Sequence, residues 1–198
     1  GAASGAASGS SGPIINAGDG SGEHPTQALL DLYTIYKEIG RLDNLVVLMV
    51  GDLAYGRTVR SLCYLLSKFN GIKIIFISPK SLGMGDDVKE YLAKHTILFE
   101  EGTDLNTHLP HADIVYMTRI QRERMSEDIY QDAKDKYSIT EENLGLLKDT
   151  ARLMHPLPRV SEIALPVFLE QTDKRIAYFR QAENGLYMRM ALLSYFLG

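Results

Sequence analysis

The chain has 198 residues, of which 45% are hydrophobic and 23% charged, a composition typical of one globular domain or one and a half. Its net charge of -4 and its lack of a basic run exclude nucleic acid as the main partner. No apolar stretch reaches the roughly 18 residues of a membrane-spanning helix, and no signal peptide is recognisable. We therefore expect no membrane partner and a cytoplasmic location, with an organellar version left open.

The first twelve residues differ in composition from the rest of the chain. Residues 1–12 are only glycine, alanine and serine. Such a segment cannot bury enough apolar surface to offset the entropy lost on ordering. We therefore expect residues 1–12 to be a flexible linker or an engineered joint, and residues 13–198 to form the folded domain.

The first predicted helix follows a glycine-rich loop. Pro25 suits a first helical turn, and the apolar run after it predicts a helix to Ile39 that ends at Gly40. His24 and Gln27 lie at the start of this helix, where free backbone N–H groups and the helix dipole attract an anion. Two functions stay open for them at this point, ligand binding and ordinary helix capping.

Strands and helices then alternate along the chain. This alternation predicts an α/β fold, a doubly wound, Rossmann-like parallel sheet flanked by helices, whose ligands bind beyond the carboxyl ends of the strands. Helices are expected from the end of the first strand to about Phe69 and over Asp86–Lys94. The predicted strands are Leu45–Val50, Ile72–Ile77, Thr96–Phe99, Ile114–Met117 and Ala151–Met154, the last of the chain.

Cysteine and histidine placement argues against several site classes. The single cysteine, Cys63, excludes a disulfide framework, and its apolar neighbours predict a buried structural thiol. Gly51–Gly56 lacks the G-x-G-x-x-G spacing of a dinucleotide site. The chain also lacks H-E-x-x-H and the nucleophile-elbow pattern, so these motifs predict neither a metal site nor a serine hydrolase.

Arginines follow several of the predicted strands. Arg57 comes after the first strand, Arg119 and Gln121 after the fourth, and His155–Arg159 after the last. Arginine holds a carboxylate or phosphate through two parallel hydrogen bonds. Converging arginines therefore indicate a small polyanionic substrate, with a surface ion-pair network as the alternative.

Four motifs together carry a family resemblance. They are His24–Gln27, Gly51–Thr58, Met117–Arg124 and His155–Arg159, in this order. With these motifs the chain resembles the aspartate carbamoyltransferase family, specifically its carboxyl-terminal, aspartate-binding half, over 13–198. The related ornithine enzymes resemble it less well, since they usually carry cysteine at the position of Pro156.

The resemblance implies a reaction that needs no metal or organic cofactor, and a set of carbamoyl contacts. Carbamoyl phosphate and L-aspartate would give N-carbamoyl-L-aspartate and phosphate, the committed step of pyrimidine synthesis. His24 would polarise the carbamoyl oxygen and Gln27 would hold the carbamoyl amide. The carbonyl groups of Pro156 and Leu157 would accept from the same amide, with Pro158 shaping the turn.

The resemblance also implies the aspartate site and the assembly. Arg57 and Arg119 would bind the two aspartate carboxylates, and Gln121 would orient Arg119. The resemblance further implies that Arg57 is a catalytic residue, together with His24 and Gln27. The parent would be a homotrimer, with regulatory chains or fused domains as further partners.

Two departures from the family pattern modify these expectations. The Ser-x-Arg-Thr phosphate loop is absent, and Ala54 stands where many members carry lysine. We therefore expect the amino-terminal, phosphate-binding domain to be missing and this chain to be inactive or weak alone. The alternative functions are a non-catalytic aspartate-binding module and an assembly scaffold.

Two helices are apolar on most of their surface. These are Ala28–Ile39 and Leu186–Leu197, which resemble the interdomain helices of the family. A helix that is apolar all round must be buried all round. Each is therefore expected to expose an apolar patch or to find another partner, with self-association as the alternative. Arg189, within the second helix, is expected to be structural.

Overall fold

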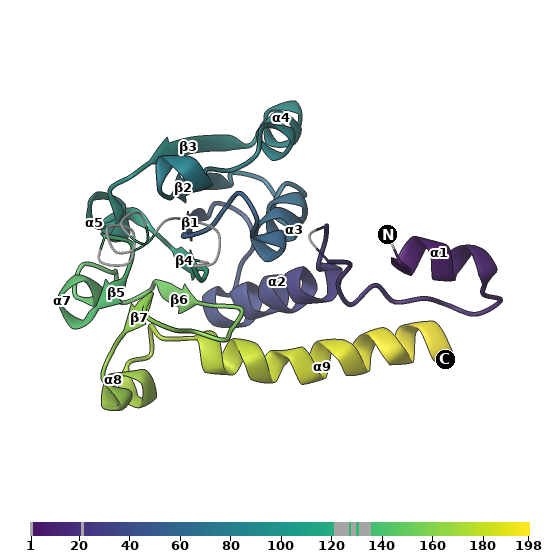
Figure 1. Cartoon of the computed structure of the whole chain (residues 1–198). Helices are drawn as coiled ribbons and strands as arrows, with labels where there is room; N and C mark the ends of the chain where they lie inside the picture. Colours follow the sequence, from purple (N-terminus) through teal and green to yellow (C-terminus); the bar gives the residue numbers. More distant parts are fainter. Residues whose placement is uncertain (1, 21, 121–126, 128–129, 131–135) are drawn as a thin grey trace.

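A five-stranded parallel sheet lies at the centre of the molecule (Figure 1). The computed structural model describes residues 2–20, 22–120, 127, 130 and 136–198. All neighbouring strands of this sheet pair in parallel, in the order β3-β2-β1-β4-β6. The strands are β1 (Val46–Val50), β2 (Lys73–Ile77), β3 (Leu98–Gly102), β4 (Ile114–Met117) and β6 (Arg152–Met154). The chain winds outward from β1 in one direction and then returns to β4, so the predicted doubly wound sheet is confirmed.

Helices cover both faces of the sheet (Figure 1). The helices of one face are α2 (Pro25–Ile39), α3 (Arg57–Leu66) and α4 (Asp86–Lys94). The opposite face carries α5 (Leu105–His108) and α7 (Glu141–Leu144). The remaining helices in the described part of the chain are α1 (Ala2–Gly9), α8 (Val167–Thr172), α9 (Tyr178–Leu197) and the 3-10 turns Lys80–Leu82 and Leu109–His111.

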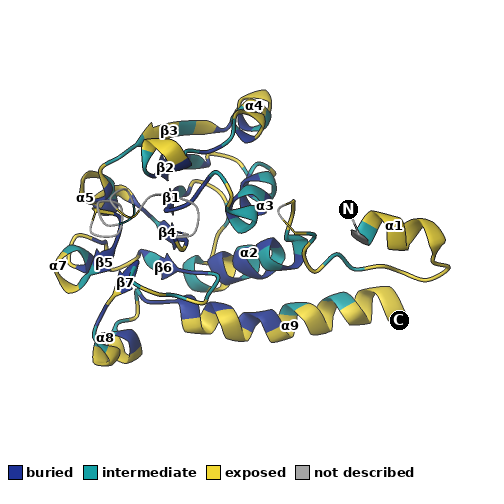
Figure 2. Ribbon diagram, viewed as in Figure 1, coloured by how far each residue is buried: buried dark blue, intermediate teal, exposed yellow. Residues whose placement is uncertain are grey.

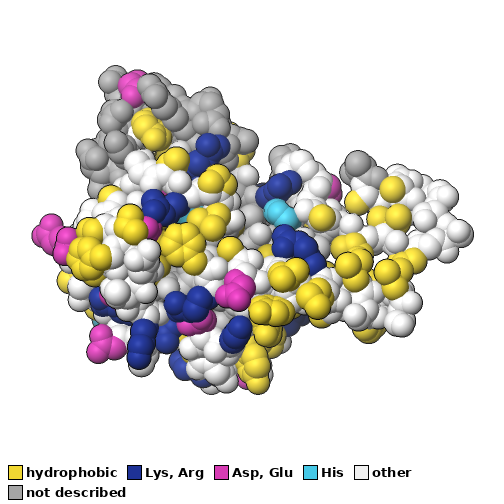
Figure 3. Space-filling view, turned by 90° about the horizontal axis from the view of Figure 1, so that it is seen from below, with side chains coloured by type: hydrophobic (Ala, Val, Ile, Leu, Met, Phe, Trp, Pro, Cys, Tyr) yellow, Lys and Arg dark blue, Asp and Glu magenta, His cyan; other side chains and the backbone are white. Residues whose placement is uncertain are grey.

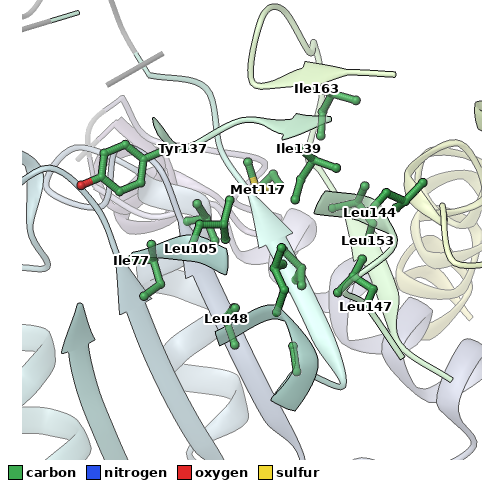
Figure 4. Packing of buried hydrophobic residues seen from close by; sticks show 14 of the residues in the cluster. Leu48, Ile77, Leu105, Met117, Tyr137, Ile139, Leu144, Leu147, Leu153 and Ile163 are labelled. Atoms are coloured by element: carbon green, nitrogen blue, oxygen red, sulfur yellow. The ribbon is translucent and has the colours of Figure 1, made fainter. Parts of the chain in front are cut away.

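The strands separate two apolar cores. Successive strand residues point to opposite faces, so Val47 and Met49 pack with α2 and α3 while Leu48 and Val50 pack on the other side. Figure 2 shows the central strands as buried, and Figure 4 shows the second core, in which Leu48 lies near side chains of the α5 and α7 regions. Burial on both faces explains the continuous apolar runs in the sequence.

Helix α2 has the predicted bounds, and its ends explain them. Pro25 occupies the first helical turn, and Gly40 ends the helix in the left-handed region at φ 81°. Helix α9 runs beside α2, and the two helices are in contact (Figure 1). Cys63 is fully buried in α3, as predicted, and burial raises the pKa of its thiol to about 12.

The structure differs from the predicted strands in two places. Strand β3 covers Leu98–Gly102 instead of Thr96–Phe99. It is an exposed edge strand that includes the polar Glu100 and Glu101, so a search for an apolar run does not find its correct bounds. A second, two-stranded sheet joins β5 (Ile139–Thr140) to β7 (Ile163–Ala164), so β6 is not the last strand. Strands of two residues are too short to give a periodic signal.

The first residues are also more regular than predicted. Helix α1 covers Ala2–Gly9, where a flexible linker is the sequence-based expectation. Figure 1 shows α1 beside the main body, joined to it by an extended stretch.

Helix α9 changes character along its length. Gln181, Asn184 and Gly185 are buried, whereas Leu193 and Leu197 are 50% and 71% exposed. Figure 3, seen from below, shows hydrophobic side chains gathered where this helix runs. The predicted exposed apolar patch is therefore present. No helix in the described part of the chain is long and apolar enough to span a membrane.

Candidate functional site

A cleft of about 440 Å³ lies where the winding direction of the sheet changes. The loops after β1, β4 and β6 meet there, each at the carboxyl end of its strand. Predicted site residues make up five of its lining positions: Arg57, Arg119, Pro156, Leu157 and Pro158. The other lining residues are Gly20, Asp52, Tyr55, Gly56, Thr58, Thr118 and His155.

Gly51 brings the loops after β1 and β4 together. Its φ is 115°, and a Cβ added there would lie 2.4 Å from the carbonyl oxygen of Thr118. Only glycine tolerates both the left-handed backbone and this close approach. The absence of a side chain at Gly51 therefore allows the segment that carries Arg57 to lie close to the segment that carries Arg119.

Arg57 begins α3 and reaches back to the glycine-rich loop. Its Nη1 donates to the carbonyl oxygen of Gly20 over 2.9 Å, and Gly18 packs closely on the same guanidinium. A guanidinium has five N–H donors, so one bond to a neutral carbonyl leaves it able to hold a carboxylate. Arg119 is exposed and also lines the cleft.

The loop after β6 is held by its own first residue. His155 is buried, its Nδ1 accepts from the backbone N–H of Leu157 over 2.8 Å, and its Nε2 lies 2.9 Å from Oε1 of Glu162. Because Nδ1 accepts, the proton of a neutral ring is assigned to Nε2, which donates to Glu162. Burial opposes ionisation of Glu162, but the hydrogen bonds from His155 and Val160 hold its pKa below the usual range. Glu162 thereby fixes the imidazole that shapes the turn at Leu157.

His24 lies at the start of α2 but its side chain does not cap the helix. Its backbone N–H donates to Oγ of Ser61 over 3.0 Å, and its Nδ1 is buried with no hydrogen-bond partner among the described residues. Burial, followed by the positive charges of Arg57 and Arg189, lowers the pKa of His24. The imidazole is therefore neutral at pH 7, with one nitrogen able to donate.

Gln27 faces the interior of the domain. Its Nε2 donates to Oδ1 of the buried Asp31 over 2.9 Å, which leaves Oε1 as the acceptor of the carboxamide. His24 and Gln27 are not among the described residues that line the cleft. Gln121, the remaining predicted site residue, lies outside the described residues.

Several cleft residues were not singled out from the sequence. Asp52 and Thr58 lie within motifs that carry the resemblance, so motif membership was the available signal. Arg189 is expected to be structural, yet its charge acts on His24 across the fold.

The described residues contain no group of three or more His, Cys, Asp or Glu that could hold a metal ion.

Two family descriptions match the chain. Residues 43–196 match "Aspartate/ornithine carbamoyltransferase, Asp/Orn binding domain", and residues 1–37 match "Aspartate/ornithine carbamoyltransferase, carbamoyl-P binding domain". The two matched ranges are separated by residues 38–42, whereas the sequence predicts a domain boundary after residue 12. The predicted boundary stays a prediction.

Curated relatives and solved structures agree with this match. The chain is 55% identical over 187 residues to the chloroplastic aspartate carbamoyltransferase of Arabidopsis thaliana, covering 93% of this chain and 47% of that protein. It is 50% identical to the catalytic subunit from Aliivibrio fischeri, covering 92% of this chain and 58% of that protein. The chain thus spans about half the length of these relatives.

Solved structures give the same family at high structural similarity. The catalytic subunit of M. jannaschii aspartate transcarbamoylase is similar with a TM-score of 0.90 and 44% identity, over 97% of this chain and 61% of that one. The Trypanosoma cruzi enzyme in complex with N-(phosphonacetyl)-L-aspartic acid is similar with a TM-score of 0.82 and 39% identity, over 91% and 58%.

One prediction is overturned by these comparisons. We expected the amino-terminal carbamoyl phosphate-binding domain to be missing, but residues 1–37 match the description of that domain. The absence of a Ser-x-Arg-Thr loop therefore does not mark the absence of the whole domain. The His24–Gln27 motif itself falls within the matched residues, so the prediction assigned this motif to the wrong part of the family pattern.

Proposed function

Because this chain belongs to the aspartate/ornithine carbamoyltransferase family, we propose that its cleft serves carbamoyl transfer from carbamoyl phosphate to L-aspartate. The product is N-carbamoyl-L-aspartate, an intermediate of pyrimidine biosynthesis, and phosphate is released. The observation that supports this most is the convergence of Arg57, Arg119 and the Pro156–Pro158 turn on one cleft. Relatives at 50–55% identity that are named for aspartate support it as the second substrate.

The carbamoyl group is bound by neutral groups in this proposal. The neutral imidazole of His24 donates to the carbamoyl oxygen, where negative charge develops as the tetrahedral intermediate forms. The Oε1 of Gln27 and the carbonyl oxygens of Pro156 and Leu157 accept from the carbamoyl amide. The match of residues 1–37 to a carbamoyl phosphate-binding domain supports this role for His24 and Gln27.

The aspartate is bound by charged groups. Arg57 and Arg119 hold its two carboxylates, and Gln121 orients Arg119. The aspartate amine attacks the carbamoyl carbon, the C–N bond forms, the C–O bond to phosphate breaks, and the proton lost by the amine passes to the departing phosphate. Positioning and charge stabilisation supply most of the acceleration in this scheme.

Arg119 variants test the aspartate site. Carbamoyl-aspartate formation is measured with each substrate varied in turn, for the unmodified chain, Arg119→Ala and Arg119→Lys. Losing a carboxylate contact should raise the KM for aspartate by about 10- to 100-fold, with the KM for carbamoyl phosphate within about twofold. Arg119→Lys should also be impaired, because an ammonium cannot form the bidentate contact.

The same assay contains the outcomes that contradict the proposal. Equal losses for both substrates would remove Arg119 from the aspartate site. No product at saturating substrates, either from the unmodified chain alone or after mixing with the part of a relative that this chain does not cover, would overturn carbamoyl transfer. Calorimetric binding of L-aspartate without turnover would then identify an aspartate-binding module instead.

Assembly and location complete the proposal. We propose a homotrimer in the cytoplasm, and sedimentation and cell fractionation test these two points. The Arabidopsis thaliana relative is named as chloroplastic, which supports an organelle as the alternative location.

A further inference from the structure

A buried carboxylate is linked by hydrogen bonds to several of the elements that carry the proposed site. Asp31 is fully buried in α2. Its Oδ1 accepts from Nε2 of Gln27 over 2.9 Å and from Nε2 of Gln181 over 2.6 Å. Its Oδ2 accepts from the hydroxyl of Tyr116 over 2.6 Å. All three donors are neutral groups, so they orient around the carboxylate without forming an ion pair.

Each donor comes from a different part of the fold. Gln181 lies in α9 and accepts from the backbone N–H of His155 over 2.8 Å, at the start of the loop after β6. Tyr116 lies in β4, three residues before Arg119. Asp31 therefore contacts, directly or through one residue, elements that supply most of the proposed site.

We propose that Asp31 is a positioning residue that sets both groups of carbamoyl-amide acceptors at once. It holds the carboxamide of Gln27 by Nε2, which leaves Oε1 as the acceptor for a ligand, and through Gln181 it fixes the backbone that leads into Pro156 and Leu157. This inference rests on the proposed function, which gives these acceptors their ligand.

The chemistry of the carboxylate explains why it can act in this way. An ionised carboxylate only accepts hydrogen bonds, so both glutamine side chains must present Nε2 to it. Gln181 must then present Oε1 to the N–H of His155, which is the observed contact. Without Asp31, either amide could turn by 180° and lose these assignments. Burial raises the pKa of Tyr116 well above its usual value, as does the charge of Asp31, so Tyr116 remains a donor.

The experiment compares three variants of buried polar groups in α2. Asp31→Leu removes the acceptors at similar volume, and Asp31→Asn keeps one acceptor oxygen. Thr34→Val is the matched control, because Thr34 is also buried and accepts from Asn184 of α9 over 3.0 Å without contacting either glutamine. The substrate-free readout is the set of 15N side-chain amide resonances of Gln27 and Gln181, assigned with Gln→Met variants. The second readout is the KM for each substrate.

The expected results separate positioning from general stability. Asp31→Leu should move both amide resonances to the values of mobile glutamines and raise the KM for carbamoyl phosphate by about tenfold, with that for aspartate within about twofold. Asp31→Asn should show the same two effects more weakly. Thr34→Val should leave both the amide resonances and the KM values unchanged.

Two results would overturn the inference. One is an Asp31→Leu variant with unchanged amide resonances, and the other is a Thr34→Val variant with the same loss of carbamoyl phosphate binding. If no product forms with the chain alone or after mixing with the part of a relative that it does not cover, the proposed function fails instead, and the substrate-free resonances still decide whether Asp31 positions the two glutamines.

Discussion

Asp31 and Glu162 are both buried carboxyl groups close to the cleft, yet their pKa values shift in opposite directions. Burial raises the pKa of Asp31 to about 6, although its three hydrogen bonds act to lower it. For Glu162 the hydrogen bonds from His155 and Val160 outweigh burial, and the pKa falls. The two groups should therefore have opposite effects on the pH dependence of folding.

The Asp31→Asn variant should reveal the first effect. A raised pKa in the folded state means that the folded chain binds the proton more tightly than the unfolded chain does. The contribution of this proton to the free energy of unfolding is therefore fully present below about pH 4. It is lost as the pH rises through about 6. Asparagine does not titrate there. The free energy of unfolding of the unmodified chain should fall by up to about 3 kcal/mol relative to the variant between pH 4 and 7.

Urea denaturation at several pH values measures this difference. Thr34→Val, which removes a non-titrating group from the same helix, is the control. A constant difference between Asp31→Asn and the unmodified chain across this range would show that Asp31 has an ordinary pKa in the folded state.

The Glu162→Gln variant should behave in the opposite way. A lowered pKa contributes stability above the ordinary glutamate value, and this contribution disappears as the pH falls through the folded-state pKa. At pH 7 the variant should be less stable by about 1–3 kcal/mol, because a charge-assisted bond to His155 is weakened. The gap should narrow on acidification. The exposed Glu142→Gln is the control, and a gap that widens toward low pH would contradict the assignment.

At the scale of elements, the site depends on how closely the ends of β1 and β4 approach. The Gly51→Ala variant places a methyl group against the Thr118 carbonyl in a left-handed backbone. We expect a loss of about 2 kcal/mol or more in unfolding free energy. It should also raise the KM for aspartate, because the loops that carry Arg57 and Arg119 are pushed apart.

Gly83→Ala is the matched control for this variant. The nearest atoms to a Cβ there are 3.8 Å away, and its φ is −63°, so alanine should be tolerated. Thermal unfolding and the aspartate assay are run on both. Equal melting temperatures for Gly51→Ala and Gly83→Ala would show that the close approach is not required.

Elements with strong local signals could be predicted from the sequence. Helix α2 has proline at one end and glycine at the other, and β4 is an apolar run buried on both faces, so both have the predicted bounds. The signal fails for β3, whose glutamates face solvent, and for the two-residue strands β5 and β7, which are defined only by their pairing. Local patterns do not contain that pairing.

In the candidate site too, features with a local sequence signal could be predicted, whereas contacts between distant residues could not. Arg57, Arg119 and the Pro156–Pro158 turn were predicted because motifs after strand ends converge at one edge of the sheet. The contacts of Asp31 could not be predicted, since Gln181 is 150 residues away along the chain and Tyr116 is 85. An isolated aspartate within a helix gives no sign of partners so distant.

At the scale of the whole molecule, α2 and α9 are joined by hydrogen bonds between buried polar side chains in addition to apolar contact. Gln181 donates to Asp31, and Asn184 both donates to Thr34 and accepts from Nζ of Lys37 over 3.1 Å. Beyond Gly185, no hydrogen bond among the described residues joins α9 to α2, although the ring of Tyr187 lies 5.5 Å from Nζ of Lys37. The helix continues with exposed apolar side chains. The first half of α9 therefore belongs to the domain, whereas its second half extends past it (Figure 2).

This gradient predicts a matching gradient in hydrogen exchange along one continuous helix. Amides of residues 178–185 should open only with the domain, because buried side chains and the contacts with α2 hold them. Amides of residues 189–197 should exchange faster by several orders of magnitude, because fraying there costs few contacts. Mass spectrometry after timed exchange separates the two halves, and residues 30–35 of α2 provide the buried reference. Equal protection along α9 would mean that its apolar face is covered. Protection that disappears on dilution would identify a second copy of the chain as the cover, since an intramolecular contact does not depend on concentration.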